Sequence, residues 1–175
     1  PFTVDEWTHN SSIKLAKNDE YWDKENVDLG AVNYQIISDT IHLNADAVAA
    51  QIEKIHTEET TALFYNNEQA LRSVIKLAYF SYRDYYVKFE ELPSGNGYAD
   101  IVYFPKRKTK FPALVVEMKW DKSAEGAISQ IKKRNYPNAI KDFGGEILLV
   151  GINYDKDAPA GERKHTCVIE KYILP

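Results

Sequence analysis

The stretch VVEMKW, residues 115–120, places a glutamate and a lysine two residues apart within an apolar run. Alanine and leucine precede it, and Met118 and Trp120 continue the apolar pattern. Such a run predicts a buried or half-buried strand. Because side chains alternate along a strand, Glu117 and Lys119 point to one face, about 7 Å apart. Two charged residues inside an otherwise apolar strand make this segment a candidate functional site.

The sequence around this strand predicts alternating helices and strands. A helix is expected from the capping residue Asn44 onward, and a second over residues 66–83. A third helix follows the capping residue Ser123. The predicted strands are YYVKFEEL, YADIVYF, ALVVEMKW, EILLVGINY and HTCVIEKYIL. The order helix, three strands, helix, strand, with one strand added, predicts an α/β domain with a mixed sheet flanked by helices.

The first forty-odd residues differ from the rest in pattern and composition. Short strands are predicted over FTVDEWT, SIKLAKN and VNYQIIS. The composition changes near Asn44, and every helix and strand of the α/β pattern lies downstream of it. We therefore expect two parts, a β-rich N-terminal appendage over residues 1–43 and an α/β domain over residues 44–175.

The bulk composition is that of an ordinary soluble protein. The 175 residues suffice for one domain with a core, and no apolar run approaches the roughly 20 residues of a membrane span. Cys167 is the sole cysteine, so no internal disulfide forms and a reducing, cytoplasmic setting is expected, with no membrane partner. The four histidines show no ligand-like spacing: His9, His42, His56 and His165.

Acidic residues are expected to meet at one end of the predicted sheet. Asp100 and Glu117 come together there if their strands are paired neighbours. Glu68, three residues before Leu71, is expected on the buried side of its helix and would add a third carboxylate. Such an oxygen-rich site suits Mg²⁺, with Mn²⁺ as a substitute, and Lys119 could orient a water or offset charge on a phosphate. The alternatives are a solvated Glu117–Lys119 pair and a helix-dipole role for Glu68.

The net charge of −4 hides an asymmetry along the chain. Residues 1–60 carry a net charge of −8, and the remainder carries +4. Two basic clusters lie in that second part, Lys106, Arg107, Lys108 and Lys110, and Lys132, Lys133 and Arg134. These clusters are candidates for contacts with nucleic-acid phosphates, and solvated surface charge is the alternative for each.

The pattern Asp100…Glu117-x-Lys119 on this order of elements resembles the PD-(D/E)xK nuclease superfamily. Residues 44–170 are similar to the branch found C-terminal to AAA-ATPase-like domains in anaerobic bacteria. The segments that carry the likeness are NNEQALRSVIKLAYFSYRDYY, ELPSGNGYADIVYFP, PALVVEMKWDKSAEGAISQIKKRNYP and GGEILLVGINYDK. The resemblance implies a restriction-endonuclease-like αβββαβ core. It also implies metal-dependent phosphodiester cleavage by Asp100, Glu117 and Lys119, with Glu68 as the helix acid.

Two further positions bear on this resemblance. Gln130 is similar to the catalytic-site glutamine that relatives carry on the helix after the Glu-x-Lys strand, although an ordinary polar helix position is the alternative. Tyr136 follows six residues later, where relatives often show a three-residue gap, so its role stays open. Ala99 stands where the signature has proline. No G-x-x-x-x-G-K-[ST] motif occurs, so an AAA-ATPase-like domain would be a partner outside this chain.

The N-terminal segment resembles a different family. Residues 1–40 are similar to a segment of the extracellular peptide-binding proteins of ABC transporters, in which a strand pair precedes a K-N-x-x-Y-W-D loop. The stretch KNDEYWD, residues 17–23, fits that loop. The function expected for the chain is a Mg²⁺-dependent nuclease acting on DNA. The alternatives are a non-cleaving nucleic-acid-binding module of the same fold and a fragment related to a periplasmic peptide-binding protein.

Overall fold

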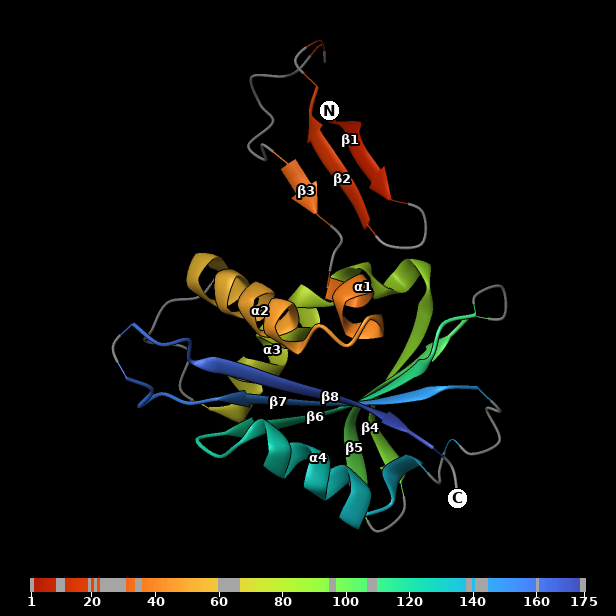
Figure 1. Ribbon diagram of the computed structural model, residues 1–175, viewed down its shortest axis with the longest axis vertical. Helices are drawn as coiled ribbons and strands as arrows, with labels where there is room; N and C mark the ends of the chain where they lie inside the picture. Colours follow the sequence, from red (N-terminus) through yellow and green to blue (C-terminus); the bar gives the residue numbers. More distant parts are fainter. Residues whose placement is uncertain are drawn as a thin grey trace.

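A three-stranded antiparallel sheet forms the N-terminal part of the chain. This computed structural model describes residues 2–8, 12–18, 20, 22, 31–33, 36–59, 67–94, 97–106, 110–137, 140, 145–159 and 161–173. Strands β1 (Phe2–Thr8), β2 (Ser12–Lys17) and β3 (Ala31–Asn33) pair in that order. The sheet projects from the rest of the chain beyond α1 (Figure 1). The expected appendage is therefore present as a separate sheet.

The predicted strand VNYQIIS is only partly correct. Its first residues fall in β3, whereas its last three begin helix α1 (Ile36–Ile41). Ile36 and Ile37 are buried in the core shared with the large sheet, and the Thr40 hydroxyl lies 2.7 Å from the Tyr79 hydroxyl. Burial of two adjacent isoleucines on one side suits a helix in this setting better than an alternating strand. Helix α1 therefore packs with the α/β body, although it lies before Asn44.

The large sheet has five strands and is mixed. Its strands are β4 (Tyr86–Ser94), β5 (Gly97–Pro105), β6 (Ala113–Trp120), β7 (Ile147–Tyr154) and β8 (His165–Tyr172), in that spatial order. Only β6 and β7 run parallel, and the other neighbouring strands are antiparallel. Every residue of β7 is buried, as its apolar run predicts for a central strand covered on both faces.

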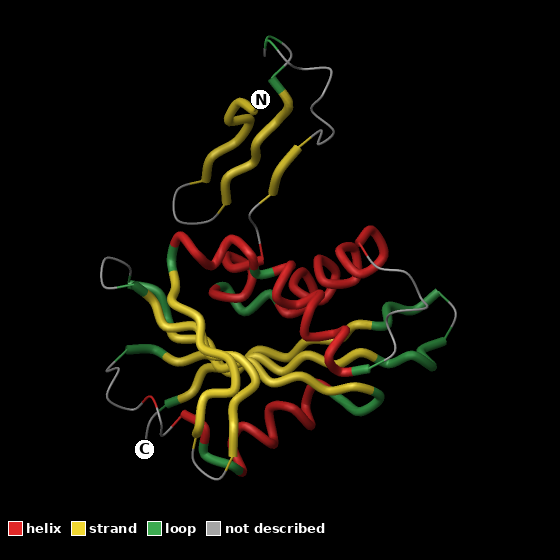
Figure 2. Tube along the Cα trace, turned by 180° about the vertical axis from the view of Figure 1, so that it is seen from behind, coloured by secondary structure: helices red, strands yellow, loops and turns green. Residues whose placement is uncertain are grey.

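Helices cover both faces of this sheet (Figures 1 and 2). One face carries α1, α2 (Ala45–Glu59) and α3 (Glu68–Ala78), and the opposite face carries α4 (Ala124–Lys133). Asn67 and Ser123 cap α3 and α4 through their side chains, and Asn44 accepts the Ala47 N–H at 3.3 Å before α2. The order α3–β4–β5–β6–α4–β7 confirms the predicted αβββαβ core. No helix in the described ranges is long and apolar enough to cross a membrane.

The second predicted helix is shorter than expected. Helix α3 ends at Ala78, and a 3₁₀ turn, η2 (Phe80–Asp84), replaces its last turn. Tyr79 at this junction is fully buried, and its ring stacks on Tyr103 of β5 with centroids 5.5 Å apart. The apolar stripe of the helix otherwise faces the core as predicted, with Leu71, Val74 and Ile75 buried. Packing of the tyrosine against the sheet thus accompanies the change of helical geometry.

A glycine allows helix α4 to approach the sheet closely. Gly151 of β7 is the parallel register partner of Glu117 on β6. A Cβ atom at Gly151 would lie only 2.3 Å from the Ala124 carbonyl oxygen and 3.0 Å from Ile128 Cγ1. A larger residue would force α4 away from the strands. This close approach brings Gln130 of α4 to the face of the sheet that carries Glu117.

Candidate active site

Strand β6 carries a glutamate and a lysine into the layer between the sheet and α4. Glu117 is 2% exposed and Lys119 is 9% exposed. Alternation along the strand puts both on the α4 side, while Val116 and Met118 face the core beneath α2 and α3. The alternative of a solvated edge pair is wrong, because β6 is a central strand and both side chains are buried.

The two carboxylate oxygens of Glu117 have different surroundings. Oε1 accepts hydrogen bonds from Lys119 Nζ at 2.8 Å and from Gln130 Nε2. Oε2 is buried and has no hydrogen-bond partner among the described residues. Burial, followed by the nearby charge of Asp100, raises the pKa of Glu117 to about 7, although Lys119 acts in the opposite direction. One carboxylate oxygen is thus held in place while the other remains available to a ligand.

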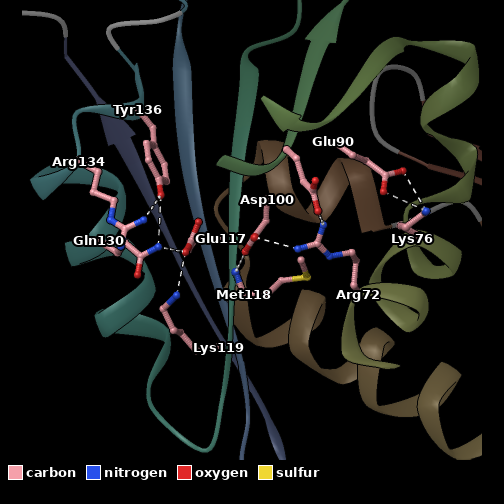
Figure 3. A network of polar contacts seen from close by, with 11 residues as sticks. Arg72, Lys76, Glu90, Asp100, Glu117, Met118, Lys119, Gln130, Arg134 and Tyr136 are labelled. Carbon is pink, nitrogen blue, oxygen red and sulfur yellow. Dashed lines mark hydrogen bonds and ion pairs between the residues drawn. The ribbon is translucent and has the colours of Figure 1, made fainter. Parts of the chain in front are cut away.

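Asp100 lies on β5, directly beside Glu117. The register pairs Ile101 with Val116, so Asp100 falls opposite Glu117. Here the backbone N–H of Met118 on β6 donates to a side chain of β5 and not to its backbone: Asp100 Oδ2 accepts this hydrogen bond at 2.8 Å. Figure 3 shows Asp100 and Glu117 on the two strands where these separate. The structure brings together the two carboxylates that the sequence placed on neighbouring strands.

Arg72 of α3 also belongs to this site, although the sequence pattern does not predict it. Its Nη2 lies 3.1 Å from Asp100 Oδ1, and its Nη1 lies 3.2 Å from Glu91 Oε1 on β4. Asp100 thus lies between Arg72 and the Glu117 group (Figure 3). An arginine four residues after Glu68 looks like any helical surface charge, so no local pattern distinguished it. Its role follows from an ion pair between residues 28 positions apart.

Gln130 and Tyr136 extend the hydrogen-bond network from Glu117. Gln130 Nε2 donates to Glu117 Oε1 and lies 3.3 Å from the Tyr136 hydroxyl. Arg134 Nη1 donates to the same hydroxyl at 3.3 Å. Tyr136 is buried. Arg134 and the Tyr136 hydroxyl pack closely over Gly97, where a Cβ atom would lie 2.9 Å from Arg134 Nη1. Tyr136 therefore supports Gln130 despite its unexpected spacing, and Gln130 is more than an ordinary polar helix position.

Glu68 does not take the buried position that its spacing predicted. It is exposed at the first position of α3, directly after the cap Asn67. A residue at the first turn extends beyond the part of the helix that packs on the sheet, which begins at Leu71. Ligand atoms of Glu68, Asp100 and Glu117 do not all lie within 4.8 Å of one another. Glu68 acts on the site through its charge, which contributes to the raised pKa of Glu117.

The residues around Glu117 fit a hard divalent cation. The group consists of carboxylate oxygens, and one of them, Glu117 Oε2, is buried without a partner in the described part of the chain. Each carboxylate oxygen has two acceptor positions, so Asp100 retains binding capacity despite its contacts with Arg72 and Met118. Oxygen ligands of this kind suit Mg²⁺ or Mn²⁺.

The predicted nucleic-acid-binding lysines and arginines are only partly available. Lys132 forms an ion pair with Glu170 at 2.5 Å, and Lys106 donates to the Arg83 carbonyl at 2.5 Å. Lys110 and Lys133 are exposed, and Arg134 contacts Tyr136. Arg107 and Lys108 lie outside the described residues. Lys132 and Lys133 of the second cluster lie in the last turn of the site helix α4, and Arg134 is its C-cap.

A known family model matches the part of the chain that carries this site. Residues 66–161, more than half of the chain, match the family model described as the PD-(D/E)XK nuclease superfamily. The chain belongs to the PD-(D/E)XK nuclease superfamily. The match spans α3 through β7, and Asp100, Glu117 and Lys119 of the signature all fall within it. The superfamily assignment makes this region a nuclease-type domain, in agreement with the sequence resemblance.

The N-terminal part of this PD-(D/E)XK chain is similar to other proteins. Residues 1–89 match the bacterial extracellular solute-binding proteins, family 5 Middle. The dipeptide-binding protein DppE of Bacillus subtilis (strain 168) is 46% identical over 39 residues, 22% of this chain and 7% of the relative. The oligopeptide-binding protein OppA of the same strain is 45% identical over 38 residues, again 22% and 7%. The chain thus spans 7% of the length of the curated relatives it matches.

Proposed function

We propose that this chain is a divalent-metal-dependent nuclease that hydrolyses phosphodiester bonds in DNA. The observation that carries the proposal is the state of Glu117, with one oxygen held by Lys119 and Gln130 and the other buried without a partner among the described residues. A buried, unpaired carboxylate oxygen is costly unless it serves a ligand. Asp100 on the adjacent strand supplies the second carboxylate. Glu68 contributes negative charge from the start of helix α3.

The roles of the protein groups follow from their contacts. A bound Mg²⁺ or Mn²⁺ would supply Lewis-acid stabilisation of negative charge on the scissile phosphate. Lys119, whose side chain is 11% exposed, contacts Glu117 and can orient a water or stabilise developing phosphate charge. Gln130 holds Glu117 in one orientation. Arg72 and the Met118 N–H hold Asp100.

The direct test is cleavage of plasmid DNA and matched DNA and RNA oligonucleotides with Mg²⁺, with Mn²⁺ and with chelator. We expect cleavage of DNA that requires the metal and is abolished in Glu117→Gln. Glu125→Gln is the matched control, because Glu125 is an exposed glutamate on α4. Equal cleavage by the parent and Glu117→Gln would refute the proposal, and cleavage of RNA alone would change the substrate.

The second candidate function is a nucleic-acid-binding module that does not cut. The observation that favours it is the Arg72–Asp100 ion pair, because a positive charge on a ligand carboxylate opposes cation binding. Under this alternative, DNA binding persists with metal and no product forms. Neutralising Lys133 and Arg134 should reduce the slope of log affinity against log salt by about one unit for each phosphate that the protein no longer neutralises. Binding that is insensitive to salt would exclude these phosphate interactions.

The remaining expectations concern partners and location. We propose an AAA-ATPase-like domain as a partner and a cytoplasmic site of action, in line with the nuclease branch that residues 44–170 resemble. Peptide binding is the third candidate, and it rests on the match of residues 1–89. Titration of the chain with dipeptides and oligopeptides tests it, and absence of binding would remove this candidate.

A further inference from the structure

A second cluster of metal-ligating side chains lies on the face of the sheet opposite Glu117. Glu53 and His56 are on α2, and His165 is the first residue of β8. One ligand atom from each of the three residues lies within 4.8 Å of the others. Helix α2 packs against β8, so residues more than 100 positions apart meet here. The spacing of the histidines along the sequence does not reveal this cluster, because it forms only on folding.

The carboxylate of Glu53 orients the His165 side of the cluster. His165 Nδ1 lies 2.5 Å from Glu53 Oε2, and the His165 backbone N–H donates to the same oxygen at 2.9 Å. The His165 side chain is fully buried, whereas that of Glu53 is 29% exposed. This contact places a carboxylate oxygen and an imidazole nitrogen of the cluster side by side.

His56 completes the group from the same face of α2. It follows Glu53 by three residues, so both side chains project from one side of the helix. The His56 and His165 rings have centroids 5.2 Å apart and planes at 75°. With ligand nitrogens about 2.0–2.1 Å from a zinc ion, two imidazoles on one tetrahedral ion have centroids roughly 5 Å apart. The observed spacing therefore suits a shared ion.

The ligand types of the cluster suit a transition-metal ion. His56 and His165 offer imidazole nitrogens, and Glu53 offers a carboxylate oxygen. Glu53 supplies a negative charge, and the pKa of its carboxyl is below its usual range in contact with His165. Lys164 lies near His56 and opposes a cation in part. Tyr154 packs against the cluster, and its ring centroid lies 5.4 Å from that of His56 and 4.9 Å from that of His165.

We propose that Glu53, His56 and His165 form a binding site for a transition-metal ion of the Zn²⁺ type that joins α2 to the edge strand β8. Two imidazoles and one carboxylate select such an ion over Mg²⁺, which prefers oxygen ligands throughout. The site is separate from the Asp100–Glu117 pair in both place and chemistry. Its effect is on stability, because an ion that binds only the folded chain opposes unfolding.

The test uses the full chain with Asp100→Asn and Glu117→Gln, so that the nuclease site does not contribute. Calorimetric titration with ZnCl₂ and thermal unfolding with ZnCl₂ or MgCl₂ are compared with those of the same protein carrying His56→Gln. We expect Zn²⁺ alone to raise Tm and the His56→Gln change to weaken Zn²⁺ binding by about tenfold or more. His42→Gln is the matched control, because His42 is an exposed histidine outside the cluster.

Co²⁺ gives an independent measurement that does not depend on the stability of His56→Gln. Co²⁺ bound to the cluster should show the visible absorption bands of a tetrahedral ion. His56→Cys should keep Co²⁺ binding and add a thiolate-to-metal charge-transfer band. Absence of both spectra, or equal Zn²⁺ affinity in the His56→Gln and His42→Gln proteins, would overturn the proposal.

Discussion

Arg72 Nη2 lies 3.1 Å from Asp100 Oδ1, and both side chains are almost buried, at 13% and 15% exposure. The pair joins α3 to β5 at the point where Asp100 also accepts the Met118 N–H. Arg72 therefore determines the orientation of Asp100 and places a positive charge at the acidic end of the site. The signature residues alone do not reveal this ion pair, and we expect it to affect both stability and cation affinity.

Replacing Arg72 should have opposite effects on these two properties. We expect Arg72→Gln to lower the free energy of unfolding by roughly 1–3 kcal/mol, because Asp100 is left without its ionic partner in a nearly buried place. The same change should tighten Mg²⁺ or Mn²⁺ binding, because a competing positive charge is removed. Urea unfolding and calorimetric titration measure the two effects. Unchanged affinity would mean that Arg72 does not act on the ligand carboxylate.

Lys76→Gln is the control for this change. Lys76 lies 2.9 Å from Glu90, but their side chains are 40% and 33% exposed, so the cost of breaking the pair should stay below about 1 kcal/mol. The double variant Arg72→Gln with Asp100→Asn completes a cycle for the buried pair. A coupling energy near zero would show that the two residues do not stabilise each other.

Lys119→Met should separate metal binding from cleavage. Lys119 contacts Glu117 but is not a proposed ligand, so cleavage should fall by about 10²-fold or more while metal binding persists. Because Lys119 lowers the pKa of Glu117, the titration belongs at about pH 8.5, where the glutamate stays ionised in the variant. Lys122→Met, at an exposed lysine, is the control. If Lys119→Met cleaved DNA at the parent's rate, the Glu117–Lys119 ion pair would have only a structural role.

Gln130→Leu should reduce the rate more than it reduces stability. Glu117 Oε1 would then retain Lys119 as its single donor among the described residues, so its orientation is less well defined. We expect kcat to fall roughly 10- to 100-fold with KM little changed. Tyr136→Phe, which removes only the more distant hydroxyl, should have a smaller effect. Equal effects on kcat from both variants, or a change confined to KM, would contradict this positioning role.

The raised pKa of Glu117 predicts a pH-dependent cost of folding in chelator-treated protein. Its carboxyl ionises near pH 7 in the folded chain and near pH 4.5 when unfolded. The raised pKa of Glu117 therefore stabilises the folded chain fully below about pH 4.5. This stabilisation is lost as the pH rises to about 7, because ionising the buried carboxyl then costs free energy in the folded state. Glu117→Gln should therefore gain stability relative to the parent between pH 5 and 8, as measured by urea unfolding. Stability curves of the parent and Glu117→Gln that stay parallel would rule this out, and Glu125→Gln, at an exposed glutamate, is the control.

Truncation should reveal where the α/β domain begins. We expect a chain starting after Asn33 to unfold cooperatively, because it keeps α1 with its buried Ile36 and Ile37. A chain starting at Asn44 lacks these side chains and the Thr40–Tyr79 hydrogen bond, and should be less stable by roughly 2–5 kcal/mol. Thermal unfolding of both chains gives the comparison. Equal melting of the two would place the boundary at residue 44, as the composition alone suggested.

The order of helices and strands was predictable because each element follows a local rule. The alternation in β6, the caps Asn67 and Ser123 and the apolar run of β7 depend on neighbours within a few residues. The same rules failed where an element meets the rest of the fold. The local pattern predicts the end of a strand where helix α1 begins, and α3 gives way to a 3₁₀ turn where Tyr79 packs on the sheet.

The sequence alone also placed Asp100 and Glu117 on neighbouring strands and Lys119 on the face of Glu117, because alternation and strand order determine which side chains share a face. Only the tertiary structure decided the surroundings that give these residues their properties. Arg72 reaches Asp100 from another element, Gln130 reaches Glu117 because Gly151 lets α4 approach, and Glu68 stays exposed at the end of its helix. Long-range contact, burial and charge depend on packing between distant segments, which a pattern of neighbouring residues does not encode.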